Sequence, residues 1–448
     1  MSDTAAPRRR FAVIGTGHRS EMYVKALAGA FCDIGQIVAF VDPNEVRMHY
    51  YDGVARESGQ SEPILHYGPD DFERMVAETS PDGLVVSSVD ATHARYIVAG
   101  LERGLDVVSE KPMTIDGPSM VAIRRAAEQS SGTLRVGFNY RYSPRNALVR
   151  ELIASGRIGE VTSVHFEWCL DTLHGADYFR RWHRNKARSG GLEVHKSSHH
   201  FDLVNWWLAD IPERVFASGG LKFYGAQNAR RRGLGERPAL GRDLPADDPF
   251  RFDLADQERL RGLYLDAEGI DGYHRDQDVF GEGIDIEDNL SVVVAYRGGA
   301  SLAYTLCAHS PWEGYRVGIN GTEGRIEIDV VERGSNLPSG GTGLLGPYFV
   351  LDPSAEAAGD PDDRYRPHRS RVLLQRHWEP ALEIPIPGAE GAHGGGDDMM
   401  LRAIFRGEDD PLGRAAGYED GIRSSVIGAA VNLSLRDGKV VLVQDLLA

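Results

Sequence analysis

A chain of 448 residues, 42% hydrophobic and 26% charged, is long enough for two or three domains with buried cores. Its formal net charge of −16 argues against nucleic acid or an anionic membrane as a partner, and no stretch approaches the about 20 apolar residues of a membrane span. Because Cys32, Cys169 and Cys307 form no CxxC pair and no apolar segment of signal-peptide length follows the N-terminal arginines, we predict a cytoplasmic protein without disulfides.

From residue 9 to about 140, strand-like and helix-like patterns alternate. The expected strands are Phe11–Ile14, Gln36–Val41, Gly83–Val86, Asp106–Val108 and Arg135–Phe138. The expected helices between them are Ser20–Ala30, Asp70–Glu78, His93–Arg103 and Pro118–Ser130. Such alternation indicates βαβ units around a parallel sheet, so we assign residues 1–140 to an α/β domain.

The first expected strand runs into a glycine turn. Gly15 and Gly17 match two positions of the G-x-G-x-x-G dinucleotide fingerprint, and Ser20 replaces the third glycine. The first glycine permits the tight turn, the second lets the backbone approach a pyrophosphate, and the following helix start offers free N–H groups. A purely structural turn is the alternative, but the strand before it and the helix after it favour a cofactor site that includes His18 and Arg19.

The second strand ends at Asp42, whose carboxylate is suited to accept both ribose hydroxyls of NAD and to repel the 2′-phosphate of NADP. A solvated strand-end aspartate is the alternative. No basic residue is adjacent, so we predict NAD as the cofactor, while Arg47 keeps NADP open as the less favoured choice.

Two further segments follow strands and therefore lie at the carboxyl edge of the sheet, where ligands bind. His93 follows the third strand, and Glu110-Lys111-Pro112 follows the fourth. A lysine there would hydrogen-bond a substrate hydroxyl and stabilise the alkoxide as hydride leaves. The alternative is an ordinary surface tripeptide. We predict Lys111 as catalytic, with His93 and Glu110 near the cofactor.

The pattern changes near residue 140, where we begin a second domain, 141–448. A helix is expected over Arg145–Ser155, another from His199 to Leu208, and a third beginning near Gly394. The expected strands are Val161–Asp171, Leu290–Tyr296, Ser301–Ala308, Tyr315–Asn320 and Gly324–Val330. Successive strands with tight turns favour a mostly antiparallel sheet. The segments 224–283 and 336–367 fit this scheme poorly, and we treat 224–283 as an insertion.

A histidine cluster precedes the helix of the second domain. Helical spacing places His195, His199 and Asp202 on roughly one face and turns His200 away. A histidine with an ordinary pKa near 6.5 suits proton removal from an alcohol. Two histidines four residues apart can also chelate zinc, but the glutamate of an HExxH motif is missing, so we predict no metal. A purely structural cluster is the remaining alternative.

With these residues in view, the chain resembles the glucose–fructose oxidoreductase, inositol dehydrogenase and rhizopine-catabolism (Gfo/Idh/MocA) family over most of its length. The resemblance rests on Gly15-x-Gly17-x-Arg19, Glu110-Lys111-Pro112, Asn139-Tyr140-Arg141 and Gly190-Gly191 leading to His199-x-x-Asp202. It implies an N-terminal Rossmann domain and a C-terminal α+β domain with a large, open, mostly antiparallel sheet that often forms dimers or tetramers. It also implies Lys111 as the catalytic lysine, His199 as the acid/base, Asp202 as a nearby substrate or orienting residue, and Arg141 near the cofactor.

One departure from the family pattern concerns the substrate. Family members commonly carry aspartate four residues before the histidine, where this chain has His195, followed by Lys196. Cation-capable residues there favour a substrate bearing a carboxylate, sulfonate or phosphate; the alternative is a rearranged set of hydrogen bonds to sugar hydroxyls. We expect both residues to contact substrate, together with His274 and Arg275 of the insertion.

The implied activity is NAD-dependent oxidation of a ring hydroxyl of a small carbohydrate, glycoside or cyclitol, by a homodimer or homotetramer. Some relatives use the same first step as hydrolases, through transient oxidation (usually at C3), elimination, hydration and re-reduction, and this stays open as an alternative. A non-catalytic NAD-binding regulator is a third interpretation, against which the presence of Lys111 and His199 counts.

Overall fold

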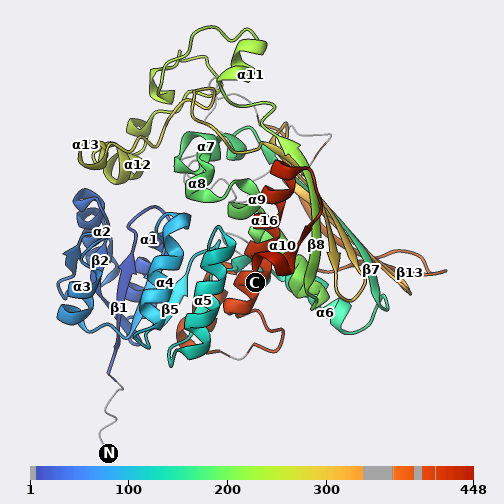
Figure 1. The fold of residues 1–448 in the computed structure, drawn as a ribbon, viewed down its shortest axis with the longest axis horizontal. Coiled ribbons are helices and arrows are strands. Elements are labelled where there is room, and N and C mark those ends of the chain that lie inside the picture. The colour runs from blue at the N-terminus through green and yellow to red at the C-terminus, as the bar shows by residue number, and fades with distance from the viewer. Residues whose placement is uncertain (1–6, 337–365, 367, 388–395, 409) are drawn as a thin grey trace, which may run out of the picture.

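The computed structural model describes residues 7–336, 366, 368–387, 396–408 and 410–448, and these form two sheets with helices packed around them (Figure 1). Most of the predicted 336–367 segment, and the predicted helix start at Gly394, lie outside the described residues. No helix among the described ranges combines the length and the apolar character that crossing a membrane requires.

The N-terminal sheet contains six described strands, all parallel, in the order β3-β2-β1-β4-β5-β6. They are β1 (Arg9–Ile14), β2 (Gly35–Val41), β3 (Leu65–Tyr67), β4 (Gly83–Val86), β5 (Asp106–Ser109) and β6 (Leu134–Val136). Its helices are α1 (Ser20–Lys25), η1 (Ala26–Ala30), α2 (Glu45–Ser58), α3 (Phe72–Thr79), η2 (Asp90–Thr92), α4 (His93–Leu101) and α5 (Gly117–Gln129). The predicted parallel sheet is confirmed, and the strand order reverses between β1 and β4, which opens a crevice at their carboxyl ends.

The second sheet contains nine described strands in the order β14-β13-β12-β11-β7-β10-β9-β8-β15. They are β7 (Val161–Asp171), β8 (Pro212–Gly220), β9 (Asn289–Tyr296), β10 (Ser301–Ser310), β11 (Glu313–Gly321), β12 (Gly324–Arg333), β13 (Arg369–Arg376), β14 (Leu382–Ile384) and β15 (Val441–Leu442). Only the central β7–β10 pair among them is parallel, so the predicted mostly antiparallel sheet is confirmed.

Helices cover one face of this sheet, and no helix of the described residues covers the other, which we call the open face (Figure 1). The second domain's helices are η3 (Asn139–Tyr142), α6 (Pro144–Ala154), α7 (His174–Arg180), η4 (Trp182–Arg184), α8 (Lys186–Ser189), α9 (Leu192–His195), α10 (Ser197–Leu208), α15 (Gly396–Arg406), α16 (Tyr418–Asp437) and η9 (Val443–Leu446). Along β7, Phe166 and Trp168 are buried while His165 and Glu167 are exposed, the alternation of a strand with one covered face.

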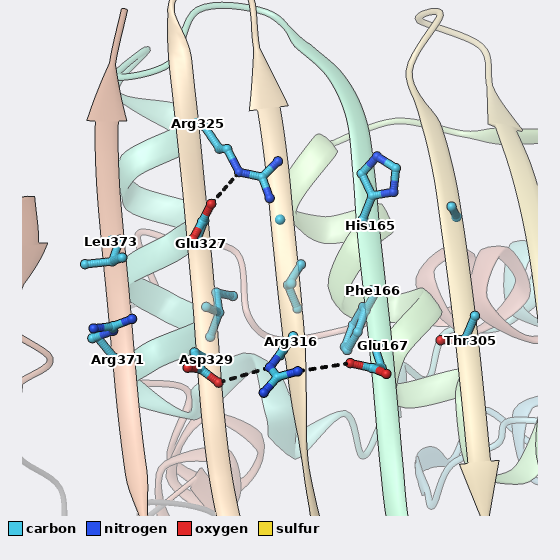
Figure 2. Close-up of a pocket in the computed structure, with 14 residues that line it drawn as sticks. His165, Phe166, Glu167, Thr305, Arg316, Arg325, Glu327, Asp329, Arg371 and Leu373 are labelled. Atoms are coloured by element: carbon cyan, nitrogen blue, oxygen red, sulfur yellow. Dashed lines mark hydrogen bonds and ion pairs between the residues drawn. The ribbon is translucent and has the colours of Figure 1, made fainter. Parts of the chain in front are cut away.

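The open face carries a shallow hollow of about 480 Å³ lined by charged side chains (Figure 2). Arg316 lies between Glu167 and Asp329, with closest nitrogen–oxygen distances of 3.8 and 3.5 Å, and Arg325 pairs with Glu327 at 2.6 Å. This hollow lies on the opposite side of the sheet from the covering helices.

The 224–283 insertion folds as a series of short helices that reach across to the N-terminal domain (Figure 1). These are α11 (Ala226–Arg231), η5 (Gly241–Asp243), η6 (Leu254–Asp256), α12 (Glu258–Leu260), η7 (Arg261–Leu265) and α13 (Glu268–Asp271). Leu260 and Leu263 share a core cluster with Met48 and Tyr51 of α2, and the Asn44 side-chain amide donates to the Ala267 carbonyl at 2.9 Å. The insertion therefore forms a roof that starts in one domain and packs on the other.

Candidate active site

A cavity of about 580 Å³ lies where the carboxyl ends of the N-terminal strands face α7 to α10 and the insertion. Its lining includes most of the predicted site residues: Gly15, Gly17, His18, Arg19, Asp42, His93, Glu110, Lys111, His195, Lys196, His199 and Arg275. Arg141, Asp202 and His274 do not line it. The structure thus brings the glycine turn, the lysine and the two histidines to one place.

The glycine turn lies against the loop after β4. Gly15 has φ +89°, and a Cβ there would stand 2.5 Å from Ser88 Cα, so only glycine fits. Ser20, at the third fingerprint position, is buried and donates its hydroxyl to the Gly17 carbonyl at 2.5 Å. Its side chain is accommodated within the turn, and the helix start still faces the cavity.

The insertion contacts this turn directly. The His18 backbone N–H donates to the Tyr264 hydroxyl at 2.9 Å, and Arg259 lies 3.0 Å from His18 Nδ1 and forms an ion pair with Glu21. Tyr264, Tyr273 and Arg275 all line the cavity. One wall of the cavity is therefore supplied by the segment that the sequence analysis treated as an insertion.

Asp42 is held by the backbone and by Arg47. Its carboxylate accepts from the N–H groups of Thr16 at 2.8 Å and Asn44 at 2.9 Å, and from Arg47 Nη2 at 3.0 Å. Arg47 also pairs with Asp271 of the insertion at 2.5 Å. Burial alone would lower the pKa of Arg47, but the two carboxylates outweigh it and raise this pKa. The basic residue that kept NADP open is thus already paired with two acids.

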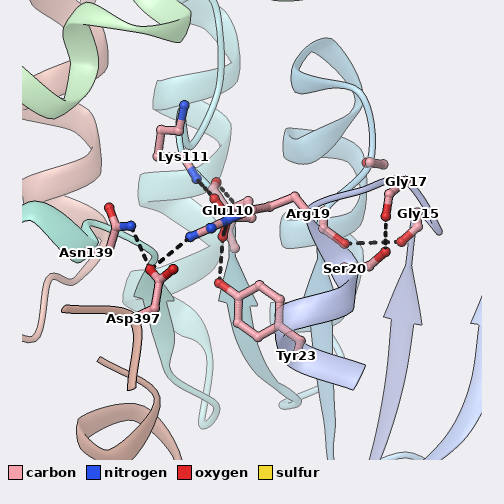
Figure 3. A network of polar contacts seen from close by, with 12 residues as sticks. Gly15, Gly17, Arg19, Ser20, Tyr23, Glu110, Lys111, Asn139 and Asp397 are labelled. Atoms are coloured by element: carbon pink, nitrogen blue, oxygen red, sulfur yellow. Dashed lines mark hydrogen bonds and ion pairs between the residues drawn. The ribbon is translucent and has the colours of Figure 1, made fainter. Parts of the chain in front are cut away.

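Glu110 anchors the segment that carries Lys111 (Figure 3). Its Oε1 accepts from Arg19 Nε at 2.7 Å and from the Tyr23 hydroxyl at 2.9 Å, and its Oε2 accepts from the Lys111 backbone N–H at 3.2 Å. Asp397 at the start of α15 extends this network, because it lies 3.5 Å from Arg19 and accepts from Asn139 at 2.7 Å. The network fixes the backbone from which the lysine projects.

Lys111 reaches from the first domain to the second. Its Nζ donates to the His195 carbonyl at 3.0 Å. Burial lowers the pKa of Lys111 to about 8, against the opposing effect of Asp90 and Glu110. His93 bridges the two predicted edge segments, with its ring nitrogens 2.8 Å from the Pro112 carbonyl oxygen and 3.0 Å from that of Ser88. The Lys111 ammonium is thereby held in a partly desolvated setting, which lowers its pKa relative to that of a lysine in water.

The segment from His195 to His200 lies next to Lys111. His195 Nδ1 lies 2.6 Å from Asp90 Oδ2, and the Lys196 ammonium donates to the Tyr140 hydroxyl at 3.1 Å. The ring of His199 stacks on Tyr140 with centroids 4.2 Å apart and an interplanar angle of 9°. His200 turns to the sheet as predicted, where its Nδ1 lies 2.7 Å from the Tyr304 hydroxyl.

Asp202 and Arg141, predicted near the substrate and the cofactor, instead form a buried ion pair with each other. Arg141 Nε and Nη2 approach the two carboxylate oxygens of Asp202 at 2.8 and 2.6 Å, and the side chains are 2% and 1% exposed. Each carboxylate oxygen of Asp202 accepts one of these bonds, and neither residue lines the cavity. His274 also lies outside it, paired with Glu268 at 3.3 Å.

Several lining residues were missed by sequence reasoning. They are Asp90, Asp177, Tyr178, Arg181, His183, Tyr264 and Tyr273. Asp90 lies in the same segment after β4 as the predicted His93, and that position was an available signal. Asp177 carries no motif; burial alone would raise its pKa, but Arg181, Arg275 and Arg180 outweigh burial and lower it to about 2.

One three-residue group in the described part of the chain has metal-ligand spacing, and it consists of His49, Asp52 and His66. This group does not line the cavity and contains neither His195 nor His199. The zinc alternative for those two histidines therefore gains no third ligand from the described residues.

Comparison with known proteins gives two family matches. Residues 9–138 match the NAD-binding Rossmann fold of the Gfo/Idh/MocA oxidoreductase family, and residues 150–443 match the C-terminal alpha/beta domain of the same family. The YteT protein of Bacillus subtilis is 34% identical over 95% of both chains. Inositol 2-dehydrogenase of Rhizobium meliloti is 27% identical over 47% of this chain and 58% of its own. The WlbA dehydrogenase of Bordetella pertussis, solved with NADH and UDP-GlcNAcA, shares the fold with a TM-score of 0.61 at 18% identity, covering 97% of this chain and 99% of its own.

Proposed function

The chain belongs to the Gfo/Idh/MocA oxidoreductase family, and we propose that it is an NAD-dependent dehydrogenase of a ring hydroxyl in a sugar, glycoside or cyclitol. The observation that carries the proposal is the meeting of Lys111, His195 and His199 in the cavity that the glycine turn lines. Inositol 2-dehydrogenase among the relatives supports the substrate class.

The residues present fit a dinucleotide. At Gly15 the space that a side chain would fill is closed by the backbone of Ser88, and the turn leads into the N-terminus of α1, where backbone N–H groups favour a pyrophosphate. Asp42 at the end of β2 lines the cavity where a ribose would lie. When bound, NAD⁺ supplies the acceptor for the hydride that leaves the hydroxyl-bearing carbon.

The chain's own residues would handle the hydroxyl group. The Lys111 ammonium donates a hydrogen bond to the substrate oxygen and stabilises the negative charge that develops there as the carbon is oxidised. A neighbouring histidine takes the hydroxyl proton, which leaves a carbonyl product. Tyr264 and Tyr273 of the insertion supply part of the cavity wall.

Charged residues that line the cavity outside the predicted cofactor contacts support an acidic sugar as the substrate. They include the carboxylates Asp90 and Asp177 and five basic residues: Lys111, Arg181, Arg188, Lys196 and Arg275. Arg181 and Arg275 share Asp177, at 2.8 and 2.7 Å, so one carboxylate offsets two guanidinium groups. We therefore include uronic acids in the proposed substrate class.

The purified protein, incubated with NAD⁺ and a panel of myo-inositol, D-glucose, D-xylose, D-glucuronate, D-galacturonate and aryl glycosides, tests the proposal. We expect NADH to accumulate at 340 nm with at least one free sugar, sugar acid or cyclitol. The hydrolase alternative stays in the test because the cavity holds two histidines beside the lysine. Aglycone release that requires NAD⁺ without accumulating NADH would favour it, and no reaction with any compound would contradict both.

A change at Asp42 tests the preference for NAD. In Asp42→Ser, Arg47 loses one of its two carboxylates and the repulsion of a 2′-phosphate is removed, so the ratio of kcat/KM for NADP⁺ to that for NAD⁺ should rise at least tenfold. Steady-state kinetics with both cofactors measure the ratio. Asp271→Asn, which removes the other partner of Arg47, is the matched control and should move it less. An unchanged ratio in Asp42→Ser would contradict the assignment of Asp42 to the ribose.

The open face of the second sheet is the surface that we propose for a second copy of the chain. Besides its charged hollow, it exposes two apolar side chains, Phe216 (42%) and Val293 (52%), which are cross-strand neighbours. Apolar residues adjacent on an exposed sheet face are typical of an interaction surface.

A further inference from the structure

A carboxylate and a histidine from different domains meet in the cavity. Asp90 is the first residue of η2, in the segment that follows β4, and is 3% exposed. His195 ends α9 in the second domain, and its Nδ1 lies 2.6 Å from Asp90 Oδ2. A carboxylate at this distance accepts a hydrogen bond from Nδ1–H. This contact favours the tautomer that has its proton on Nδ1 and its lone pair on Nε2.

The remaining nitrogen of His195 is available to a ligand. The His195 side chain is 12% exposed and lines the cavity, and its Nε2 makes no hydrogen bond to any residue in the described ranges. The rings of His183 and Trp182 approach its edge, with centroids 4.2 and 6.0 Å away. The lysine is a close neighbour that also lines the cavity, since Lys111 Nζ donates to the backbone carbonyl of His195 at 3.0 Å.

The surroundings keep this imidazole neutral. Burial lowers the pKa of His195 well below its ordinary value, and the positive charges of Lys111, Arg181 and Lys196, with His93 beyond them, lower it further. Burial also raises the pKa of Asp90, against the opposing effect of Lys111 and Arg181. A neutral histidine held by a carboxylate is the form that accepts a proton at pH 7.

His199 is differently placed. Its ring lies flat on Tyr140, and the side chain is 6% exposed. Asp202, one turn further along α10, pairs with Arg141 through both carboxylate oxygens and does not line the cavity.

We propose that His195 is the catalytic residue that takes the hydroxyl proton, with Asp90 as its positioning residue and His199 in a supporting position. The inference rests on the proposed function. In the step, the substrate O–H bond breaks and its proton forms a bond to Nε2 of His195. The hydrogen on the hydroxyl-bearing carbon leaves as hydride to NAD⁺, and the C–O bond becomes a carbonyl. The Asp90 carboxylate keeps its hydrogen bond to Nδ1–H and stabilises the imidazolium that results.

Kinetics of three variants test the assignment, with the compound of the panel that gives the fastest NADH production. His195→Gln should lower kcat at least a hundredfold, the scale of a lost general base, and His199→Gln about tenfold. Asp90→Asn should lower kcat by a factor between these and change its pH dependence, because an amide can donate to Nδ1 and impose the wrong tautomer. His49→Gln, exposed on α2 outside the cavity, should keep the wild-type rate.

A second readout needs no substrate. In ¹⁵N-histidine-labelled protein with NAD⁺, the signals missing from His195→Gln identify His195. We expect the Nδ1–H tautomer at pH 7 in the wild type and a shift toward the Nε2–H tautomer in Asp90→Asn. A role in packing alone would not produce this exchange of tautomers.

The outcomes separate this inference from the proposed function. A His195→Gln enzyme within threefold of the wild-type kcat, with His199→Gln inactive, would overturn the inference and leave the dehydrogenase intact. An Nε2–H tautomer in the wild-type protein would also overturn it, whether or not a substrate is found. Loss of the proposed function appears separately, as a wild-type protein that binds NADH, measured by its fluorescence, and oxidises no compound of the panel.

Discussion

Replacing Lys111 with methionine should lower kcat about 10²- to 10³-fold and leave NADH binding close to that of the wild type. This is the scale of losing one preorganised donor to a developing oxyanion. Methionine keeps most of the stem volume and removes the ammonium, so Glu110 and the backbone that it anchors are undisturbed. Initial rates at 340 nm and a fluorescence titration with NADH measure the two quantities.

The pH dependence provides the control for Lys111. Burial lowers its pKa to about 8, so the protonated donor is lost as pH rises through that value, and the wild-type rate should fall above pH 8. Lys111→Arg keeps its positive charge over this range and should retain part of the activity without that decline. A methionine variant as active as the wild type would contradict the catalytic assignment.

The features that the sequence predicts well are those encoded locally. The glycine turn and the parallel sheet follow from patterns within about thirty residues, and β4 is buried throughout, as its continuous apolar run indicates. Predicted β7, Val161–Asp171, agrees with the structure at both ends, and from Val164 to Trp168 buried and exposed residues alternate over the covered and open faces.

The features that the sequence did not predict depend on partners far along the chain. α16 has no polar face that would mark it as a helix, because it is buried between α10, α5, α9 and β8 and is apolar or small on nearly every side. The helices of the roof were not predicted within the 224–283 insertion, since they have only three to six residues and are stabilised by contacts with α2 and the glycine turn.

The misplacement of Asp202 shows the same limit within the site. His195 and His199 both line the cavity, but Asp202, which helical spacing places on the same face, does not. Asp202 pairs with Arg141, 61 residues earlier in the chain. The carboxylate that contacts His195 is that of Asp90, 105 residues before it. No local pattern encodes either pairing.

Arg141→Met is expected to lower the free energy of unfolding by about 3–5 kcal/mol, because it leaves the carboxylate of Asp202 buried without its partner. Arg141 joins three elements: it binds Asp202 of α10, lies 3.0 Å from Asp420 in the first turn of α16, and itself belongs to η3. Burial alone would lower the pKa of Arg141, but Asp202 and Asp420 outweigh it and raise this pKa, so the guanidinium stays charged. Urea unfolding followed by circular dichroism measures the loss.

The double variant Arg141→Met/Asp202→Leu distinguishes a lost ion pair from a lost anchor. Replacing both members of a buried pair with apolar side chains removes the uncompensated charge, and such replacements are often neutral or stabilising. The double variant should therefore recover more than half of the stability that Arg141→Met loses. Because neither residue lines the cavity, its kcat should stay within about threefold of the wild type if the pair acts only by holding η3, α10 and α16 together. A double variant as unstable as Arg141→Met would show that the bond to Asp420, rather than the charge of Asp202, carries the effect.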